Sequence, residues 1–394
     1  MLATTGGRSK ALYPAIVTLT IIVVAVAAGV VLAKGRGGSE SSTSTSSSPL
    51  ISNTSSSAAQ SETSTNTSAS ASATAGAVTG GTSSSAQSSA ASTGSIGIIN
   101  IVAAENFWGS LVSQIAGVHG NVTSVVSDPN VDPHEYQSNP ANAKAIADAK
   151  LVVINGMNYD IWAQLIINAT NAPGQTVINV QKVVGISSPT EAQTINGVLS
   201  TVNPHLWYSP YYVNDSDHAF YDALVKIDPA DQAYFKANYA TLNSSLYHDY
   251  MQQEEQIKAQ WGGTPYGDGT AKNGTNVAST ESIFIFMANA TGLNIVTPQT
   301  FMKATAEVDD PSPSNYATFQ QQLAGGPTSV ACLVYNVQTV TPVTEALESE
   351  ATQYHVPTTY VSETIDPPDL TFQSWMQGEV AGLQSCLTSS APGQ

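Results

Sequence analysis

Two histidines and two carboxylates occupy positions from which side chains could bind a metal ion. His134 and His205 each follow a proline, which restricts the backbone and limits the entropy lost when the side chain is fixed. Glu281 and Asp366 each come after a short apolar run. Together the four would offer two imidazole nitrogens and two carboxylate oxygens to a divalent cation. Because the imidazoles must be neutral to bind, affinity should fall as the pH drops through the range in which histidine titrates.

The apolar pattern predicts the elements that would position these side chains. One series of strands and helices alternates along the chain, and a second series repeats the arrangement. Such alternation indicates an α/β fold with parallel sheets flanked by helices, in which ligands bind at the carboxyl ends of the strands. The first series has strands at 98–103, 122–126 and 151–154 and helices at 108–115, 141–149 and 159–167; the second has strands at 275–278, 330–335 and 357–361 and helices at 282–290, 341–354 and 370–387.

One long helix is predicted between the two series. Residues 230–260 contain neither proline nor glycine, and Asp228-Pro229 supplies a helix cap followed by proline at the first helical position. A helix over 229–261 would then connect two lobes, at 96–228 and 262–394.

Two further segments precede the lobes. Residues 11–33 form a charge-free apolar stretch that would be roughly 34 Å long as a helix, enough to cross a bilayer core. A cleavable signal is the alternative, but its apolar region is usually shorter, so residues 1–36 are interpreted as a membrane anchor. Of the 57 residues from Ser39 to Ser95, 33 are serine or threonine, which predicts a disordered stalk over 37–95.

The charge balance excludes one class of partner. The chain has 12 Lys and Arg against 29 Asp and Glu, a net charge of −17, and nucleic-acid binding needs clustered basic residues. A cation is the expected charged partner. The scarcity of basic residues also suggests an acidic habitat as a hypothesis. Two cysteines cannot build a tetrathiolate metal site.

Four stretches resemble the metal-binding substrate-binding proteins of bacterial-type ABC importers for zinc and manganese. They are Val131-Asp132-Pro133-His134-Glu135-Tyr136, Pro204-His205-Leu206-Trp207, Tyr234 to Asn238, and Ala149 to Gly156. The likeness extends from Ile98 to about Leu387. It implies two α/β lobes joined by a rigid helix, with one metal ion between them held by His134, His205, Glu281 and Asp366.

The resemblance also bears on the identity of the metal. In that family the third ligand is histidine in many zinc proteins and glutamate in many manganese proteins, and here it is Glu281. Carboxylate oxygens suit Mn2+, and residues 181–202 lack the histidine-rich loop of many zinc importers, so Mn2+ is favoured over Zn2+ as cargo. The chain departs from the family pattern at Asn203, where aspartate is common, and at Tyr208-Ser209-Pro210. Cys332 and Cys386 could form a disulfide, as in some relatives, or remain two buried thiols.

These observations predict an extracytoplasmic receptor, anchored by its N-terminal helix and monomeric, that captures a divalent transition metal and delivers it to an ABC permease without acting on it as an enzyme. A zinc or ferrous iron receptor with the same ligands is the nearest alternative. A metal-dependent hydrolase would need an open coordination position and a general base. A surface adhesin would explain the stalk but not the paired Pro-His turns.

Overall fold

The computed structural model describes residues 97–131, 133, 136–188, 194–195, 198–199, 203–307 and 309–390. The predicted anchor and stalk lie outside these residues, and so does His134. Within the described ranges, no helix combines the length and the apolar character needed to span a bilayer. Residues 86–394 group together as one unit.

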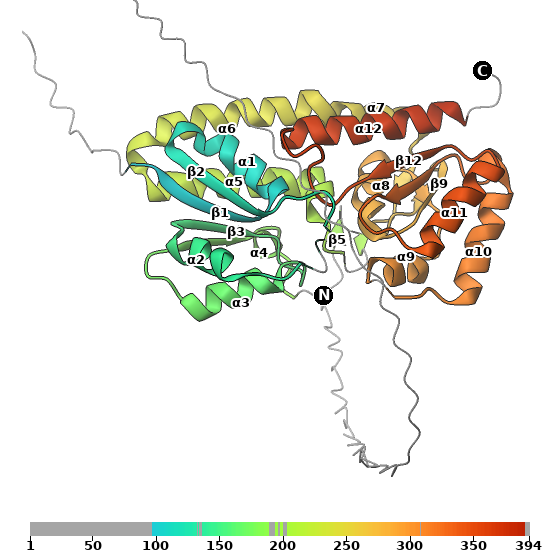
Figure 1. The fold of residues 1–394 in the computed structure, drawn as a ribbon. Helices are drawn as coiled ribbons and strands as arrows, with labels where there is room; N and C mark the ends of the chain where they lie inside the picture. Colours follow the sequence, from blue (N-terminus) through green and yellow to red (C-terminus); the bar gives the residue numbers. More distant parts are fainter. Residues whose placement is uncertain are drawn as a thin grey trace, which may run out of the picture. The chain divides into compact units, whose positions relative to one another are not determined.

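The first half of the unit contains a parallel sheet in the order β2-β1-β3-β4 (Figure 1). Its strands are β1 (Ile99–Glu105), β2 (Gly120–Val126), β3 (Leu151–Ile154) and β4 (Thr176–Asn179). Its helices are α1 (Asn106–Ala116), α2 (Pro140–Asp148), α3 (Ile161–Thr170), α4 (Val180–Val183) and α5 (Pro210–Ile227).

Alternate residues of β1 explain why helices cover both faces of this sheet. Ile101 and Ala103 belong to one apolar cluster, with Leu111 of α1 and Phe220 of α5. Val102 and Ala104 point to the other face, where they cluster with residues of α2 and α3. A strand that is buried on both faces is typical of a parallel sheet between two helical layers.

The second half repeats this plan with the strand order β10-β9-β11-β12, again parallel. Its strands are β9 (Asn276–Ser279), β10 (Asn294–Ile295), β11 (Leu333–Asn336) and β12 (Thr358–Val361). Its helices are α8 (Ile285–Thr291), α9 (Gln299–Ala306), α10 (Pro313–Ala324), α11 (Pro342–Gln353) and α12 (Phe372–Ser389). Short hairpins pair β5 (Thr194–Ile195) with β6 (Val198–Leu199) and β7 (Thr264–Pro265) with β8 (Ala271–Lys272). The predicted α/β fold with helix-flanked parallel sheets is confirmed.

The helix between the two sheets is not uniform. It begins with a 3-10 turn at Pro229–Asp231 and continues as α6 (Gln232–Leu246), a π-helical turn at Tyr247–Met251 and α7 (Gln252–Trp261). Figure 1 shows α6 and α7 running from one sheet to the other, with α12 packed beside α7. This helix and α12 therefore bridge the two halves.

Buried polar contacts also join the halves, close to the carboxyl ends of both sheets. Asn106, at the start of α1, bonds both backbone groups of Ile365: its Nδ2 donates to the carbonyl oxygen at 3.2 Å, and its Oδ1 accepts from the amide at 3.0 Å. Tyr208 lies in the 3-10 turn Leu206–Tyr208, and its hydroxyl lies 2.7 Å from the carbonyl oxygen of Ser362 and 2.6 Å from Oε2 of Glu379 in α12.

The Tyr208 contacts indicate a protonated Glu379. A single hydroxyl proton cannot be donated to both the Ser362 carbonyl and the Glu379 carboxyl group. If Glu379 carries a proton, it donates to the Tyr208 oxygen, and Tyr208 donates to Ser362. Burial raises the pKa of Glu379 to about 8, and the hydrogen bonds that Tyr208 and Ser362 would donate to the ionised form only partly oppose this effect.

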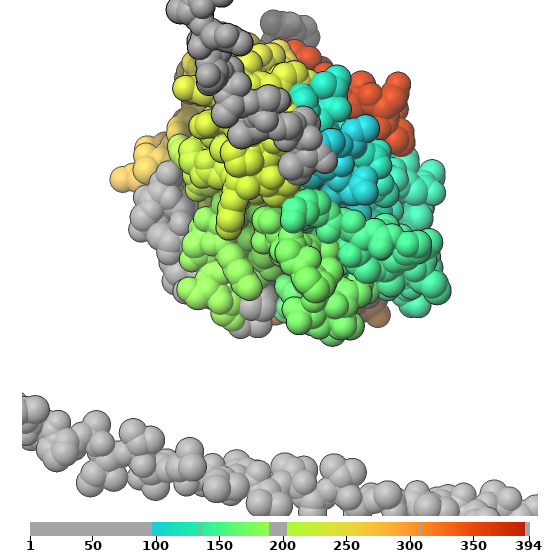
Figure 2. Space-filling model, turned by 90° about the vertical axis from the view of Figure 1, so that its left-hand side faces the viewer, coloured from blue at the N-terminus to red at the C-terminus, as the bar shows by residue number. Residues whose placement is uncertain are grey.

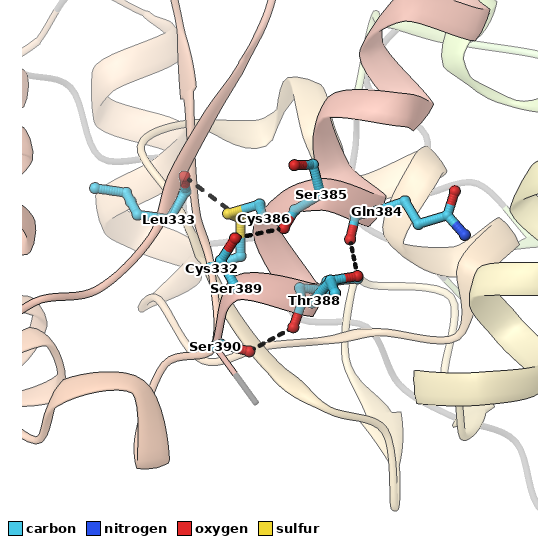
Figure 3. The surroundings of a disulfide bond; sticks show 9 residues. Cys332, Leu333, Gln384, Ser385, Cys386, Thr388, Ser389 and Ser390 are labelled. Carbon is cyan, nitrogen blue, oxygen red and sulfur yellow. Dashed lines mark hydrogen bonds between the residues drawn. A yellow bond between two sulfur atoms is a disulfide. The ribbon is translucent and has the colours of Figure 1, made fainter. Parts of the chain in front are cut away.

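The two cysteines form a disulfide and are not free thiols. Cys332, directly before β11, is bonded to Cys386 in α12, with a Cα–Cα distance of 5.7 Å (Figure 3). The bond fixes the last helix to a central strand of the second sheet.

Removal of this disulfide should destabilise the protein. The bond closes a loop with a sequence separation of 54 residues, for which chain entropy predicts a loss of about 4 kcal/mol. We expect the Cys332→Ala, Cys386→Ala variant to show this loss in urea unfolding monitored by circular dichroism. The parent should lose a similar amount under a reducing agent that leaves the variant unaffected, and equal unfolding free energies of oxidised parent and variant would contradict the prediction.

Glu379 should make the folded state less stable as the pH rises. Its pKa is about 8 when folded and near the ordinary value of 4.5 when unfolded, so the folded state binds the extra proton between these values. The contribution is complete below about pH 4.5 and is lost as the pH rises through about 8. Glu379→Gln should flatten the pH dependence of the unfolding free energy in this range, whereas exposed Glu345→Gln should not. Parallel pH profiles for the parent and Glu379→Gln would refute the assignment.

Candidate metal-binding site

Three buried side chains from both halves of the unit converge on one point. His205, Glu281 and Glu363 each offer a ligand atom, and these atoms lie within 4.8 Å of one another. The three residues are at most 1% exposed. His205 belongs to the first half, Glu281 follows the end of β9 and Glu363 follows the end of β12. Both carboxylates thus lie at the carboxyl edge of the second sheet, as the position of ligands in open parallel sheets predicts.

The structure brings together two of the four residues predicted from the sequence. His205 and Glu281 belong to the group, and His134 lies outside the described residues. Asp366 does not join them, because the chain stays buried from Val361 through Ile365 and Asp366 is the first exposed residue. Glu363, three residues before Asp366, is the residue that lies with His205 and Glu281. The distance from the preceding strand could have identified Glu363 in the sequence, because Glu281 and Glu363 each lie two residues after the end of a strand.

The environment of His205 fixes which ring nitrogen can bind a metal. The Nδ2 of Asn203 donates to the carbonyl oxygen of Ser282 at 2.8 Å, so its Oδ1 is the acceptor facing His205. That oxygen lies 2.7 Å from Nδ1 of His205 and also accepts from the His205 amide at 3.0 Å. Nδ1 therefore carries the proton in neutral His205, and Nε2 presents the lone pair that a metal ion requires. Asn203 performs this role without the negative charge of an aspartate.

Asn155 holds the peptide before His205. Its Nδ2 donates to the carbonyl oxygen of Pro204 at 2.9 Å, and its Oδ1 accepts from Nε1 of Trp108 at 3.1 Å. The amide of Asn155 in turn donates to Asp160, whose pKa burial raises to about 6 although this bond and one from Gly156 lower it. The Pro-His turn is thus attached to the end of β3.

Asn336 holds the two carboxylates close together. Its Nδ2 donates to Oε1 of Glu281 at 2.6 Å and to Oε1 of Glu363 at 2.8 Å. The hydroxyl of Tyr159, from the first half, donates to Oε2 of Glu363 at 2.7 Å. Two carboxylates in such proximity repel each other when both are ionised, and burial strengthens the repulsion. A cation between them would remove this cost.

The chemistry of the group suits a divalent transition metal. One imidazole nitrogen and two carboxylate oxygens are ligands that Zn2+, Mn2+ and Fe2+ accept, and a second histidine would complete a four-ligand set. Ca2+ and Mg2+ prefer sites made of oxygen ligands alone. Since the ligands come from both halves, occupancy would favour the arrangement that brings the halves together.

Comparison with curated proteins finds relatives that are described as metal-binding. The manganese-binding lipoprotein MntA of Halalkalibacterium halodurans is 25% identical over 162 residues, which are 41% of this chain and 49% of the relative. The iron-binding protein YfeA of Yersinia pestis is 26% identical over 133 residues, 33% of this chain and 40% of the relative. The chain thus spans about half the length of the curated relatives it matches, or less.

Solved structures share the fold at lower identity. The periplasmic zinc-binding protein TroA of Treponema pallidum superposes with a TM-score of 0.57 at 14% identity, covering 75% of this chain and all of that one. A Mn-bound periplasmic metal-binding protein of Candidatus Liberibacter asiaticus gives a TM-score of 0.56 at 16% identity, with coverage of 73% and 98%. At these identities the likeness concerns the fold alone.

One family model covers both sheets and the helix between them. It is described as the periplasmic component A of the zinc-uptake complex (ZnuA), and it matches residues 101–386, which include His205, Glu281 and Glu363. The chain belongs to this family.

Proposed function

We propose that the protein is an extracytoplasmic receptor that captures a divalent transition metal, with Mn2+ as the first candidate, and delivers it to an ABC permease. The observation that carries the proposal is the convergence of His205, Glu281 and Glu363 from both halves on one buried point. The family assignment supports a role in metal uptake, and the relatives named for manganese, iron and zinc support a transition metal as cargo. The receptor would act as a monomer, attached to the membrane by residues 11–33.

The proposed ligands are His134, His205, Glu281 and Glu363. Glu363 replaces Asp366 in this set because Glu363 is buried beside Glu281, while Asp366 is exposed. Two carboxylates and two imidazoles favour Mn2+ more than a histidine-rich set would. Zn2+ has the higher intrinsic affinity for most sites of this kind, so it should also bind.

Burial of the ligands argues against a catalytic role. A hydrolytic metal needs an open coordination position for water and a substrate, and a general base nearby. His205, Glu281 and Glu363 are at most 1% exposed, so the cation would be enclosed. An enclosed ion suits capture and release through movement of the two halves. An adhesin would need no such group.

Metal binding should depend on Glu363 and not on Asp366. After removal of bound metal by a chelator, Mn2+ or Zn2+ at about 100 times its dissociation constant should add roughly 2.7 kcal/mol to the unfolding free energy of the parent. Glu281→Gln and Glu363→Gln should lose most of this gain. Asp366→Asn, the matched control for carboxylate removal, should retain it.

Thermal unfolding with Mn2+, Zn2+ or Fe2+ added singly checks this prediction and ranks the cargo ions. If no ion stabilises the parent, the receptor proposal fails. Loss of the gain in Asp366→Asn with retention in Glu363→Gln would restore the original assignment of Asp366.

Asn336 should matter although it would not contact the metal. Its amide holds Glu281 and Glu363 in place, and loss of such an orienting group typically costs 10- to 100-fold in metal affinity, so we expect about that loss for Asn336→Ala. Asn289→Ala is the control, because Asn289 is also buried but bonds only the backbone of Gly267 and Gly269 among the described contacts. Competition with a metal-sensitive dye measures both affinities. Equal losses in the two variants would show a general effect on folding instead.

A further inference from the structure

A second group of ligand-type side chains lies in the first half, at the amino ends of its strands. His119 immediately precedes β2, while Asp228 caps the 3-10 turn that begins the connecting helix and Asp231 is the last residue of that turn. Each offers one ligand atom, and these atoms lie within 4.8 Å of one another. In Figure 1 the starts of β2 and α6 lie together at the left end of the molecule, and Figure 2 views this end, where cyan and yellow surfaces meet.

His119 and Asp231 form the accessible part of this group. Nδ1 of His119 lies 2.9 Å from Oδ2 of Asp231, and their side chains are 23% and 22% exposed. Although this separation is that of an ion pair, Oδ2 of Asp231 makes no hydrogen bond within the described ranges. Both side chains are thus partly exposed, while Oδ2 of Asp231 itself is buried.

The two carboxylate oxygens of Asp228 differ in their contacts. Its Oδ1 accepts a hydrogen bond from the Ala230 amide at 3.2 Å, which is an ordinary helix cap. Its Oδ2 is buried, and it has no hydrogen-bond partner in the part of the chain that the structure describes. The whole residue is 1% exposed. A buried carboxylate oxygen without a partner costs folding free energy, which a bound cation would recover.

The surrounding contacts hold the two elements in place. The Val118 amide donates to the hydroxyl of Tyr234 at 3.1 Å, and Nδ2 of Asn238 donates to the carbonyl oxygen of Ile115 at 3.1 Å. The His119 ring also packs edge-on against Tyr234, with centroids 4.6 Å apart. The end of α1 is thus fixed to α6 independently of any ion, so little ordering would accompany binding.

We propose that His119, Asp228 and Asp231 form a second site for a divalent transition metal of the Zn2+ class, separate from the site between the halves. One imidazole nitrogen and two carboxylate oxygens are ligand types that Zn2+ accepts, and three protein ligands leave a position for water. The site joins the turn before β2 to the start of the connecting helix. Its ligands all come from the first half and the start of this helix, so binding there does not require the two halves to close.

The chain provides a matched control. His218 and Asp222 also form a histidine–aspartate pair, with Nδ1 of His218 at 3.4 Å from Oδ2 of Asp222, but both side chains are more than 60% exposed (61% and 63%). Within the described residues this pair has no third ligand-type group that would complete a cluster. His218→Ala therefore removes a histidine of the same kind without touching the proposed site.

The test uses the full chain with the site between the halves disabled by His205→Ala and Glu281→Gln. Calorimetric titration of this background with Zn2+, after chelator treatment, should show one bound ion per chain. Adding Asp228→Asn, which preserves the helix cap, should weaken that binding by at least about tenfold, and so should adding His119→Gln. Adding His218→Ala should leave it unchanged. Absorption of bound Co2+ in the visible range provides a second readout of the same ligands.

The outcomes separate this proposal from the proposed function. If the parent binds two ions and the background one, both sites exist. If the parent and the background each bind one ion that depends on Asp228, the second site exists and the receptor proposal fails. If the background binds no Zn2+, or if Asp228→Asn and His119→Gln bind as the background does, the group is an ion pair and a helix cap only, and the second site is refuted.

Discussion

The placement of two buried carboxylates at the edge of one sheet is the constraint on which the rest of the structure depends. Glu281 follows β9 and Glu363 follows β12, and Asn336 from β11, which lies between these strands, donates to both. Like charges at this separation are unfavourable in a buried environment. A cation bound between the two carboxylates would offset this repulsion.

The contacts around the carboxylates hold the first half against them. Tyr159 donates to Glu363, Tyr208 contacts Ser362 immediately before it, and Asn106 fixes Ile365 two residues after it. Each contact joins residues more than 150 positions apart, with separations of 204, 154 and 259. The segment that carries Glu363 is thus held from the first half, and a movement between the halves would alter the ligand geometry directly.

Buried acidic residues also lie outside the candidate metal site, and all of them change the stability of the protein with pH in the same direction. Burial raises the pKa values of Glu105, Asp160, Asp217, Glu254 and Glu379. A folded state that binds protons more tightly than the unfolded state loses stability as the pH rises. The hypothesis of an acidic habitat, drawn from the sparse lysine and arginine and the acidic surface, predicts a change of stability in the same direction.

Much of the fold follows from patterns that are local in the chain. The apolar runs predicted β3 at its observed bounds and most other predicted strands to within two or three residues, because strands buried on both faces are marked by short continuous apolar sequences. Asp228-Pro229 marked the start of the connecting helix, and the position of Glu281 after a strand marked one residue of the candidate metal site. Helices α5 and α10 were not predicted, since their polar residues obscure the helical periodicity.

Tertiary structure decided what local patterns could not. Asp366 is the ligand predicted from the sequence after β12, whereas the chain stays buried through Ile365, so that Glu363 lies inside and Asp366 is exposed. Likewise, a separation of 54 residues between two cysteines does not show whether they form a disulfide. The sequence by itself determined the residue types and the strand ends that a metal site would need. Which side chains meet depends on contacts between distant segments, because burial and distance arise only when the two halves pack together.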